Sequence, residues 1–330
     1  MSTPQLPFLV FLQIFQSQIV DFLQFAYLYS PLYNHKSFLH TCFLKRSDYI
    51  EQQKIQCSFK NDESWLILSP IEQSIKQKIE AVGTPLRDWD IRINRGILTG
   101  YNEAFIIDKK KRDELIKKDA KSAEIIRPIL RGRDIRKYGY DFADLYLIYI
   151  PWHFPLHNDT SVQGASLEAE KLFEQDYPAI YSHLLKFKEK LSSRNKSETG
   201  IRYEWYALQR WGAKYWDDFS KPKIIYPNMT KYLPFYLDRE NFVANQKCFI
   251  MTGEKLEFLV SFFNSNVFKV CFKDYFPELQ GGTRELSKIF FENIPIPKFV
   301  KDIAVTEEEI YKIYDFNESE INWISSSLNE

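Results

Sequence analysis

The chain has 330 residues, of which 45% are apolar and 16% aromatic, so it is long enough to bury a substantial core. Its four cysteines are widely spaced and form no CxxC pair. This spacing argues against a disulfide framework or a zinc knuckle and fits a cytoplasmic location. The formal net charge is zero, which by itself gives no sign of a polyanionic partner.

Residues 1–62 form an N-terminal segment that differs from the rest of the chain. Asp21 is the one charged side chain before Lys36, and glutamines interrupt the apolar run. A clean membrane span of about 20 apolar residues is therefore absent, and no basic region of a signal peptide precedes the run. We expect a helix over residues 1–43 that is buried or covered by a partner rather than a membrane anchor, then a polar connector over residues 44–62.

A domain is predicted over residues 63–299, and it begins with a helix and a hairpin. Ser69 has the position of an N-cap, and Gly83 follows the expected last helical residue. In residues 93–108 two glycines four positions apart and several polar residues lie between apolar runs. We predict a β-hairpin here, whose two loop glycines let another molecule approach the backbone.

The later elements mix strands and helices without regular βαβ alternation. We predict a helix at 110–123, a loop at 127–138, a strand at 145–150, helices over 167–191, strands at 223–229, 235–238 and 247–252, and a buried helix at 256–268. Residues 300–330 form an acidic helical tail. The fold class is therefore mixed α/β, of the α+β kind, with an irregular sheet and flanking helices.

Charge is partitioned along the chain. Residues 109–139 hold 12 Lys and Arg against 5 Asp and Glu, residues 186–231 hold 11 against 5, and residues 301–330 hold 2 against 8. Because binding depends on the local field, the two basic segments are candidates for contact with a nucleic acid. Solvated helix faces explain such runs equally well.

The candidate phosphate-binding residues crowd one glycine-containing loop: Arg127, Arg131, Arg133, Arg136 and Lys137. Asp134 lies among them and is expected to orient one arginine. The candidate hairpin loop contributes Gly96, Thr99, Gly100 and Asn102.

The second basic segment interleaves cations with aromatic rings: Tyr203, Trp205, Tyr206, Trp211, Tyr215, Trp216, Phe219, Tyr226, Tyr232, Phe235 and Tyr236. Such rings can stack on bases, although Tyr226 and Tyr236 fall in predicted strands and are expected in the core. For residues 194–210 we favour groove contact. The side chains able to read bases are Arg202, Gln209, Arg210 and Asn228.

A metal site is not expected. His153 and His157 are four residues apart, but Pro151 and Pro155 interrupt any helix there. No third ligand has the spacing of a metal motif.

Residues 65–298 resemble the C-terminal target-recognition domain of TaqI-like and type IIG restriction–modification enzymes. The matching segments lie at 96–105, 128–135, 223–227, 245–249, 263–265 and 294–297. The resemblance implies recognition of double-stranded DNA for a site-specific adenine-N6 methyltransferase or endonuclease.

The catalytic motifs of that family are absent from the sequence. No Pro-Pro dipeptide occurs, so the Asn-Pro-Pro-aromatic loop that holds a flipped adenine is missing. We therefore expect S-adenosylmethionine only in a catalytic partner or domain. The chain is then a separate specificity polypeptide or a truncated remnant. The alternatives are a complete but divergent methyltransferase or nuclease, and a protein–protein scaffold.

Overall fold

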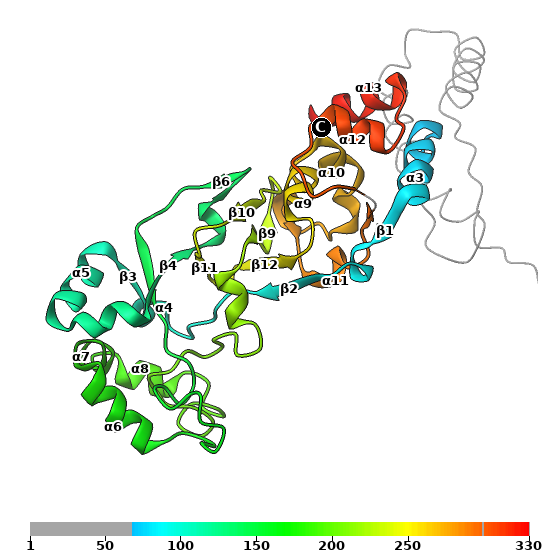
Figure 1. The fold of residues 1–330 in the computed structure, drawn as a ribbon. Helices are drawn as coiled ribbons and strands as arrows, with labels where there is room; N and C mark the ends of the chain where they lie inside the picture. Colours follow the sequence, from blue (N-terminus) through cyan, green and yellow to red (C-terminus); the bar gives the residue numbers. More distant parts are fainter. Residues whose placement is uncertain (1–67, 299, 330) are drawn as a thin grey trace, which may run out of the picture. The chain divides into compact units, whose positions relative to one another are not determined.

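The computed structural model describes residues 68–298 and 300–329. The predicted N-terminal segment, residues 1–62, lies outside the described residues. Residues 71–330 cluster into one compact unit, whose elements are labelled in Figure 1. None of the described helices has the length and apolar character that crossing a lipid bilayer requires.

Helices and strands alternate irregularly along this unit. The helices are α3 (Pro70–Val82), α4 (Asn102–Phe105), α5 (Lys109–Lys118), α6 (Leu167–Asp176), α7 (Pro178–Leu185), α8 (Lys188–Ser193), α9 (Leu256–Phe263), α10 (Asn266–Cys271), α11 (Lys288–Phe291), α12 (Glu307–Ile313) and α13 (Glu318–Ser326). The strands are β1 (Gly83–Pro85), β2 (Ile91–Arg95), β3 (Ile106–Asp108), β4 (Ile126–Leu130), β5 (Ile135–Arg136), β6 (Gly139–Tyr140), β7 (Leu145–Ile148), β8 (Lys223–Pro227), β9 (Met229–Thr230), β10 (Tyr236–Asp238), β11 (Val243–Ala244), β12 (Cys248–Gly253), β13 (Arg284–Glu285) and β14 (Pro295–Pro297). The α+β prediction is confirmed.

An antiparallel sheet of order β10-β8-β12-β2 separates two hydrophobic cores. Successive residues of a strand point to opposite faces, and β12 follows this rule. Cys248 and Ile250 belong to the first core, whereas Phe249 and Met251 belong to the second. The sheet is therefore buried on both faces, which explains why its strands are almost continuously apolar.

The first core lies between this sheet and a second sheet of order β11-β4-β7-β3. In the second sheet β11 pairs with β4 in parallel, and the other pairs are antiparallel. Helices α6 and α7 add buried Phe173, Ile180 and Leu184 to this core. Pro178 is the first residue of α7, so the predicted break in residues 167–191 is confirmed.

Helices α9 and α10 contribute Phe258, Phe262, Phe263 and Phe268 to the second core. These two helices replace the single predicted helix at 256–268. The break lies at Asn264 and Ser265, where the Ser265 hydroxyl accepts from the Phe268 N–H and caps α10. The chain can therefore turn within a wholly buried segment, because the cap satisfies the new helix end.

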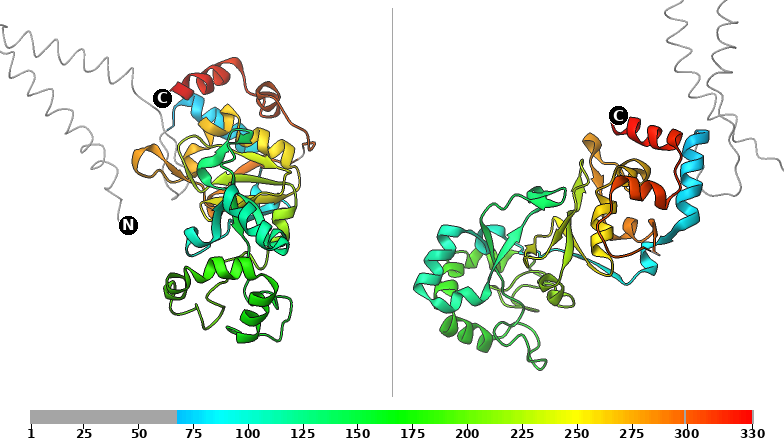
Figure 2. Two further views of the ribbon diagram at one scale, coloured as in Figure 1. Left: turned by 90° about the vertical axis from the view of Figure 1, so that its left-hand side faces the viewer. Right: turned by 45° about the horizontal axis from the view of Figure 1, so that its top comes forward.

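The C-terminal helices α12 and α13 pack onto this second core through Ile310, Tyr314 and Ile324. Figure 2 shows them beside α3. The contact is fixed by Glu320, which is 1% exposed and accepts hydrogen bonds from Lys78 Nζ at 2.8 Å and Ser74 Oγ at 2.6 Å. The acidic segment is thus joined to the first described helix by a buried carboxylate.

We expect this contact to weaken in acid. Burial raises the pKa of Glu320, but hydrogen bonds from Lys78 and Ser74 more than offset it, so the pKa is lowered overall. A lowered folded-state pKa stabilises the fold above the unfolded pKa of about 4.3 and loses that effect as pH falls through the folded value. Urea midpoints of wild type and Glu320→Gln should differ at pH 7 and converge in acid. A constant difference would contradict this account.

Candidate nucleic-acid interface

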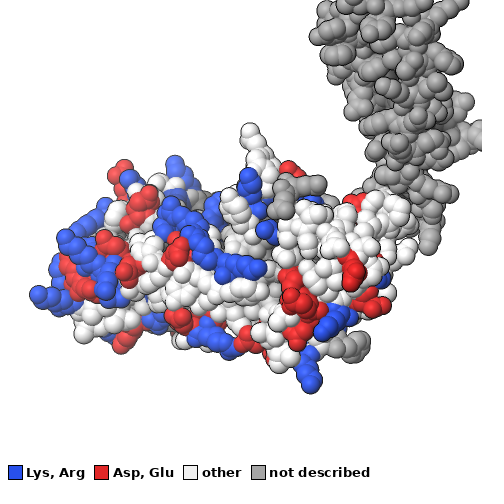
Figure 3. All heavy atoms as spheres, turned by 90° about the horizontal axis from the view of Figure 1, so that it is seen from above, with Lys and Arg blue, Asp and Glu red and all other residues white. Residues whose placement is uncertain are grey.

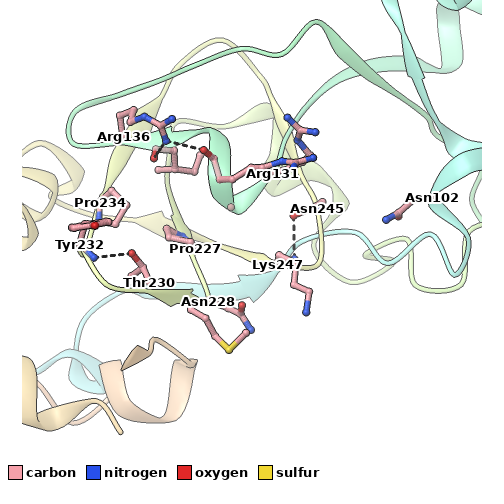
Figure 4. Close-up of a pocket in the computed structure, with 14 residues that line it drawn as sticks. Asn102, Arg131, Arg136, Pro227, Asn228, Thr230, Tyr232, Pro234, Asn245 and Lys247 are labelled. Atoms are coloured by element: carbon pink, nitrogen blue, oxygen red, sulfur yellow. Dashed lines mark hydrogen bonds between the residues drawn. The ribbon is translucent and has the colours of Figure 1, made fainter. Parts of the chain in front are cut away.

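A hollow of about 540 Å³ lies where the ends of several strands meet (Figure 4). We call it the cationic hollow. Its lining residues are Asn102, Arg131, Gly132, Arg133, Ile135, Arg136, Pro227, Asn228, Met229, Thr230, Tyr232, Pro234, Asn245 and Lys247. Four of them are cations and none is a carboxylate. In Figure 4, Tyr232 and Thr230 lie at one end and Asn102 at the other, with Lys247 between.

Backbone contacts bring these distant segments together. The Asn228 N–H donates to the Lys247 carbonyl at 2.9 Å, and the Asn245 N–H donates to the Leu130 carbonyl at 3.0 Å. Gly132 packs against the same place: a Cβ there would lie 3.1 Å from the Lys247 carbonyl oxygen. The glycine therefore lets the turn at residues 131–136, which we call the arginine turn, approach the end of β8 closely.

The arginines of the hollow differ in how far they are neutralised. Arg131 donates to both carboxylate oxygens of Asp134, at 2.9 and 2.7 Å, and Asp134 is 4% exposed. This hydrogen bonding raises the pKa of Arg131. The prediction that Asp134 orients an arginine is confirmed. Arg136 forms a more exposed pair with Asp141 at 2.7 Å.

Arg133 and Lys247 carry the uncompensated charge of the hollow. Both side chains are exposed, and neither forms an ion pair with another described residue within 4.0 Å. Figure 3 shows a run of Lys and Arg across the middle of one face, whereas acidic and basic side chains are mixed toward its ends. Exposed, unpaired cations are the groups best able to exchange counterions for phosphates.

Two of the predicted phosphate contacts lie outside this lining. Arg127 donates to the carbonyls of Ala123 and Ile126, and Lys137 lies over the Tyr138 ring. The prediction of a loop from residue 127 is wrong at its start, because residues 126–130 are strand β4. Its buried Ile129 and Leu130 belong to the first core and pair with β11, whereas residues 126–128 pair with β7, and these pairings decide the local structure.

The predicted hairpin is also wrong. Strand β2 pairs with β12, whereas β3 pairs with β7 in the other sheet. A Cβ on Gly96 would lie 2.1 Å from the Asn245 carbonyl oxygen, so this glycine admits the chain's own backbone. Gly100 has the predicted positive φ, +80°, and packs against Gln209 and Arg194.

Thr99 and Asn102, the polar candidates of the loop at residues 96–102, differ in exposure to the hollow. Thr99 is 1% exposed and donates its hydroxyl to Asn102 Oδ1 at 2.7 Å. Asn102 itself lines the cationic hollow. The structure thus brings Asn102 to the arginine turn and keeps Thr99 inside the protein.

The base-reading candidates separate into two groups. Asn228 lines the cationic hollow. Arg202 and Arg210 instead share one carboxylate, Glu198, with N–O distances of 3.0 and 2.9 Å. Gln209 adjoins Arg210 and contacts the Gly100 loop. These three residues do not line the hollow.

Groove contact by Arg194 is contradicted. Its guanidinium donates to the carbonyls of Thr99, Leu191, Trp205 and Ala207. Burial lowers the pKa of Arg194 to about 10, which still leaves it charged at neutral pH. A planar cation with several donors suits this contact between loops, because it satisfies four carbonyls at once.

Most aromatic rings of residues 203–236 fill the core. Tyr203, Tyr206 and Phe235 are wholly buried, and Tyr149 stacks on Trp216 with centroids 3.4 Å apart. Tyr226 and Tyr236 are buried as predicted. Tyr232 is the exception in this segment, at 75% exposed. Stacking on bases by the other buried rings is therefore excluded in this conformation.

Sequence reasoning did not select Asn245, Lys247 or Met229 as site residues. The signal was present, because residues 245–249 form one of the segments that carry the family resemblance. What was missing is the pairing of β12 with β8, which brings Lys247 next to Asn228.

A mixed α+β unit with a cation-lined hollow has the features of a nucleic-acid-binding domain. Residues 127–296, more than half of the chain, match the TaqI-like C-terminal specificity domain. The chain belongs to this family, and its role is DNA recognition within restriction–modification. The resemblance identified in the sequence is confirmed.

Similar proteins include a curated enzyme and two solved structures. The type II methyltransferase M.MjaIV of Methanocaldococcus jannaschii is 24% identical over 236 residues, or 68% of this chain and 71% of that protein. The type IIG restriction endonuclease BpuSI is 15% identical, with a TM-score of 0.42 over 79% of this chain and 28% of that one. The type IIL restriction–modification enzyme MmeI, solved in complex with DNA, is 12% identical, with a TM-score of 0.31 over 64% of this chain and 22% of that one. This chain therefore spans less than a third of either solved protein.

Proposed function

We propose that double-stranded DNA binds over the cationic hollow and that this chain supplies sequence recognition to a methyltransferase or endonuclease. The observation that carries the proposal is the unbalanced lining: Arg131, Arg133, Arg136 and Lys247 converge with no carboxylate among the lining residues. Arg133 and Lys247 would contact phosphates, and the pair Arg131–Asp134 would present a fixed guanidinium.

Two amides of the hollow are candidates to read bases: Asn102, whose side chain is exposed, and Asn228, which is 9% exposed. An Asn side chain can make a bidentate contact to adenine, and the loss of such a contact costs about 1–3 kcal/mol of discrimination. Arg202, Gln209 and Arg210 remain base-reading candidates on a neighbouring loop. For the two arginines, contact with DNA would require exchange of the Glu198 carboxylate for a base or phosphate.

The catalytic chemistry is assigned to a separate domain or subunit. S-adenosylmethionine carries a sulfonium cation, and a hollow lined by four cations and no carboxylate disfavours it. This lining does not fit the cofactor, so we route no step of methyl transfer through the hollow. We propose that this separate domain or subunit performs adenine-N6 methylation or DNA cleavage at the site that this chain recognises.

Salt dependence tests the proposal directly. A library of randomised short duplexes is used to select a bound sequence, whose affinity is then measured by electrophoretic shift from low to moderate salt. The two phosphate contacts of Arg133 and Lys247 predict a slope of log K against log salt of about −1.8. No duplex binding at low salt, even with a methyltransferase partner added, would overturn the proposal.

One observation favours the alternative of a complete enzyme. The methyltransferase of M. jannaschii is matched over 71% of its own length. Calorimetric titration with S-adenosylmethionine separates the two readings. We expect no binding heat from this chain alone, and saturable binding would favour the complete enzyme.

A further inference from the structure

Tyr232 is an exposed ring at the edge of the cationic hollow. It is 75% exposed, whereas the other rings of residues 203–236 are buried or half-buried. Within the described residues no ring pair or cation–ring contact involves it. The ring therefore contributes little to the hydrophobic core, although it adjoins a segment that does.

The backbone that carries Tyr232 is firmly held. The Tyr232 N–H donates to Thr230 Oγ1 at 3.0 Å, and Thr230 lies in β9, which pairs with β13. The next residue, Leu233, adopts a positive φ of 49° and is 7% exposed, so it anchors the turn in the second core. The ring thus projects from a short turn that is fixed on both sides.

An apolar neighbour extends this feature. Met229 is 48% exposed and also lines the hollow, three residues before Tyr232. Exposed apolar side chains beside cations match the requirements of duplex DNA: the cations hold the phosphates while apolar wedges enter the base stack. Charge complementarity therefore identifies the occupant of this edge as DNA.

We propose that Tyr232, supported by Met229, inserts into the base stack of the bound duplex and opens one base step. The inference rests on the proposed function and adds a positioning role to it. Opening a step costs unstacking energy, and a duplex whose stack is already broken avoids that cost. Such a duplex should therefore bind more tightly than an intact one.

The test compares two short duplexes of the same sequence, one fully paired and one with a central abasic site. By fluorescence anisotropy we expect wild type to bind the abasic duplex about tenfold more tightly. Tyr232→Phe should keep this preference, and Tyr232→Ala should reduce it to less than about twofold. Tyr138→Ala is the matched control, because Tyr138 is 53% exposed and does not line the hollow.

A second measurement makes the result independent of the variants. 2-Aminopurine placed at successive positions of the fully paired duplex should brighten at one step when wild type binds. Binding without brightening at any position, or a preference unchanged in Tyr232→Ala, would overturn the inserted ring and leave DNA recognition standing. Equal weakening on both duplexes would also overturn it. If wild type bound neither duplex, the result would instead contradict the proposed function.

Discussion

We expect the double variant Arg133→Ala/Lys247→Ala to lose most of its affinity for duplex DNA while keeping its fold. Both side chains are exposed and line the cationic hollow, and neither forms an ion pair with another described residue within 4.0 Å. Each phosphate contact contributes about 0.9 to the salt slope, so the slope should fall in magnitude by about 2. The loss should be similar for all sequences, because phosphate contacts carry no direct sequence information. Electrophoretic shifts over a salt series measure both quantities.

The matched control is Lys269→Ala/Lys301→Ala. It removes the same total charge from exposed positions that do not line the hollow. Its salt slope should stay close to that of wild type. An equal loss of DNA affinity in both double variants would mean that binding depends on total charge alone. It would contradict the hollow as the binding surface.

The second large effect concerns stability and comes from a buried ion pair in the central sheet. Lys223 and Asp238 are both 0% exposed and are register partners across β8 and β10. Lys223 also donates to the Phe219 carbonyl at 2.6 Å, and Asp238 accepts from the Phe242 N–H at 3.0 Å. Lys223→Met would leave the carboxylate buried without its cation, which costs about 3–5 kcal/mol. Urea denaturation at neutral pH measures this loss.

Replacing both residues shows how much of the loss in stability comes from the direct interaction between Lys223 and Asp238. Lys223→Met/Asp238→Leu removes both buried charges, so it should be destabilised much less than the sum of the two single variants. Strict additivity of the single losses would contradict a direct interaction. DNA binding by the folded fraction should persist, because neither residue lines the hollow.

Local sequence signals determined several element boundaries and the family of this protein. The start and end of α3, the break before α7 and the strands β8, β10 and β12 follow from caps, prolines and apolar runs that act over a few residues. Asp134 could be assigned to an arginine because the two groups lie three residues apart. The six segments that resemble the family can likewise be recognised from the sequence alone, because each is a short run of consecutive residues.

Tertiary structure decided which residues form the site. Tyr203 and Tyr232 are alike in sequence context, yet one is 0% and the other 75% exposed, because burial depends on the face that each segment turns to the core. Gly96 is required by the carbonyl of Asn245, nearly 150 positions further on, so its partner could not be read locally. The cationic hollow likewise exists only because the pairing of β12 with β8 brings residue 247 to residue 228. Contacts between distant segments depend on register and sheet order, and a single sequence does not encode these in any local pattern.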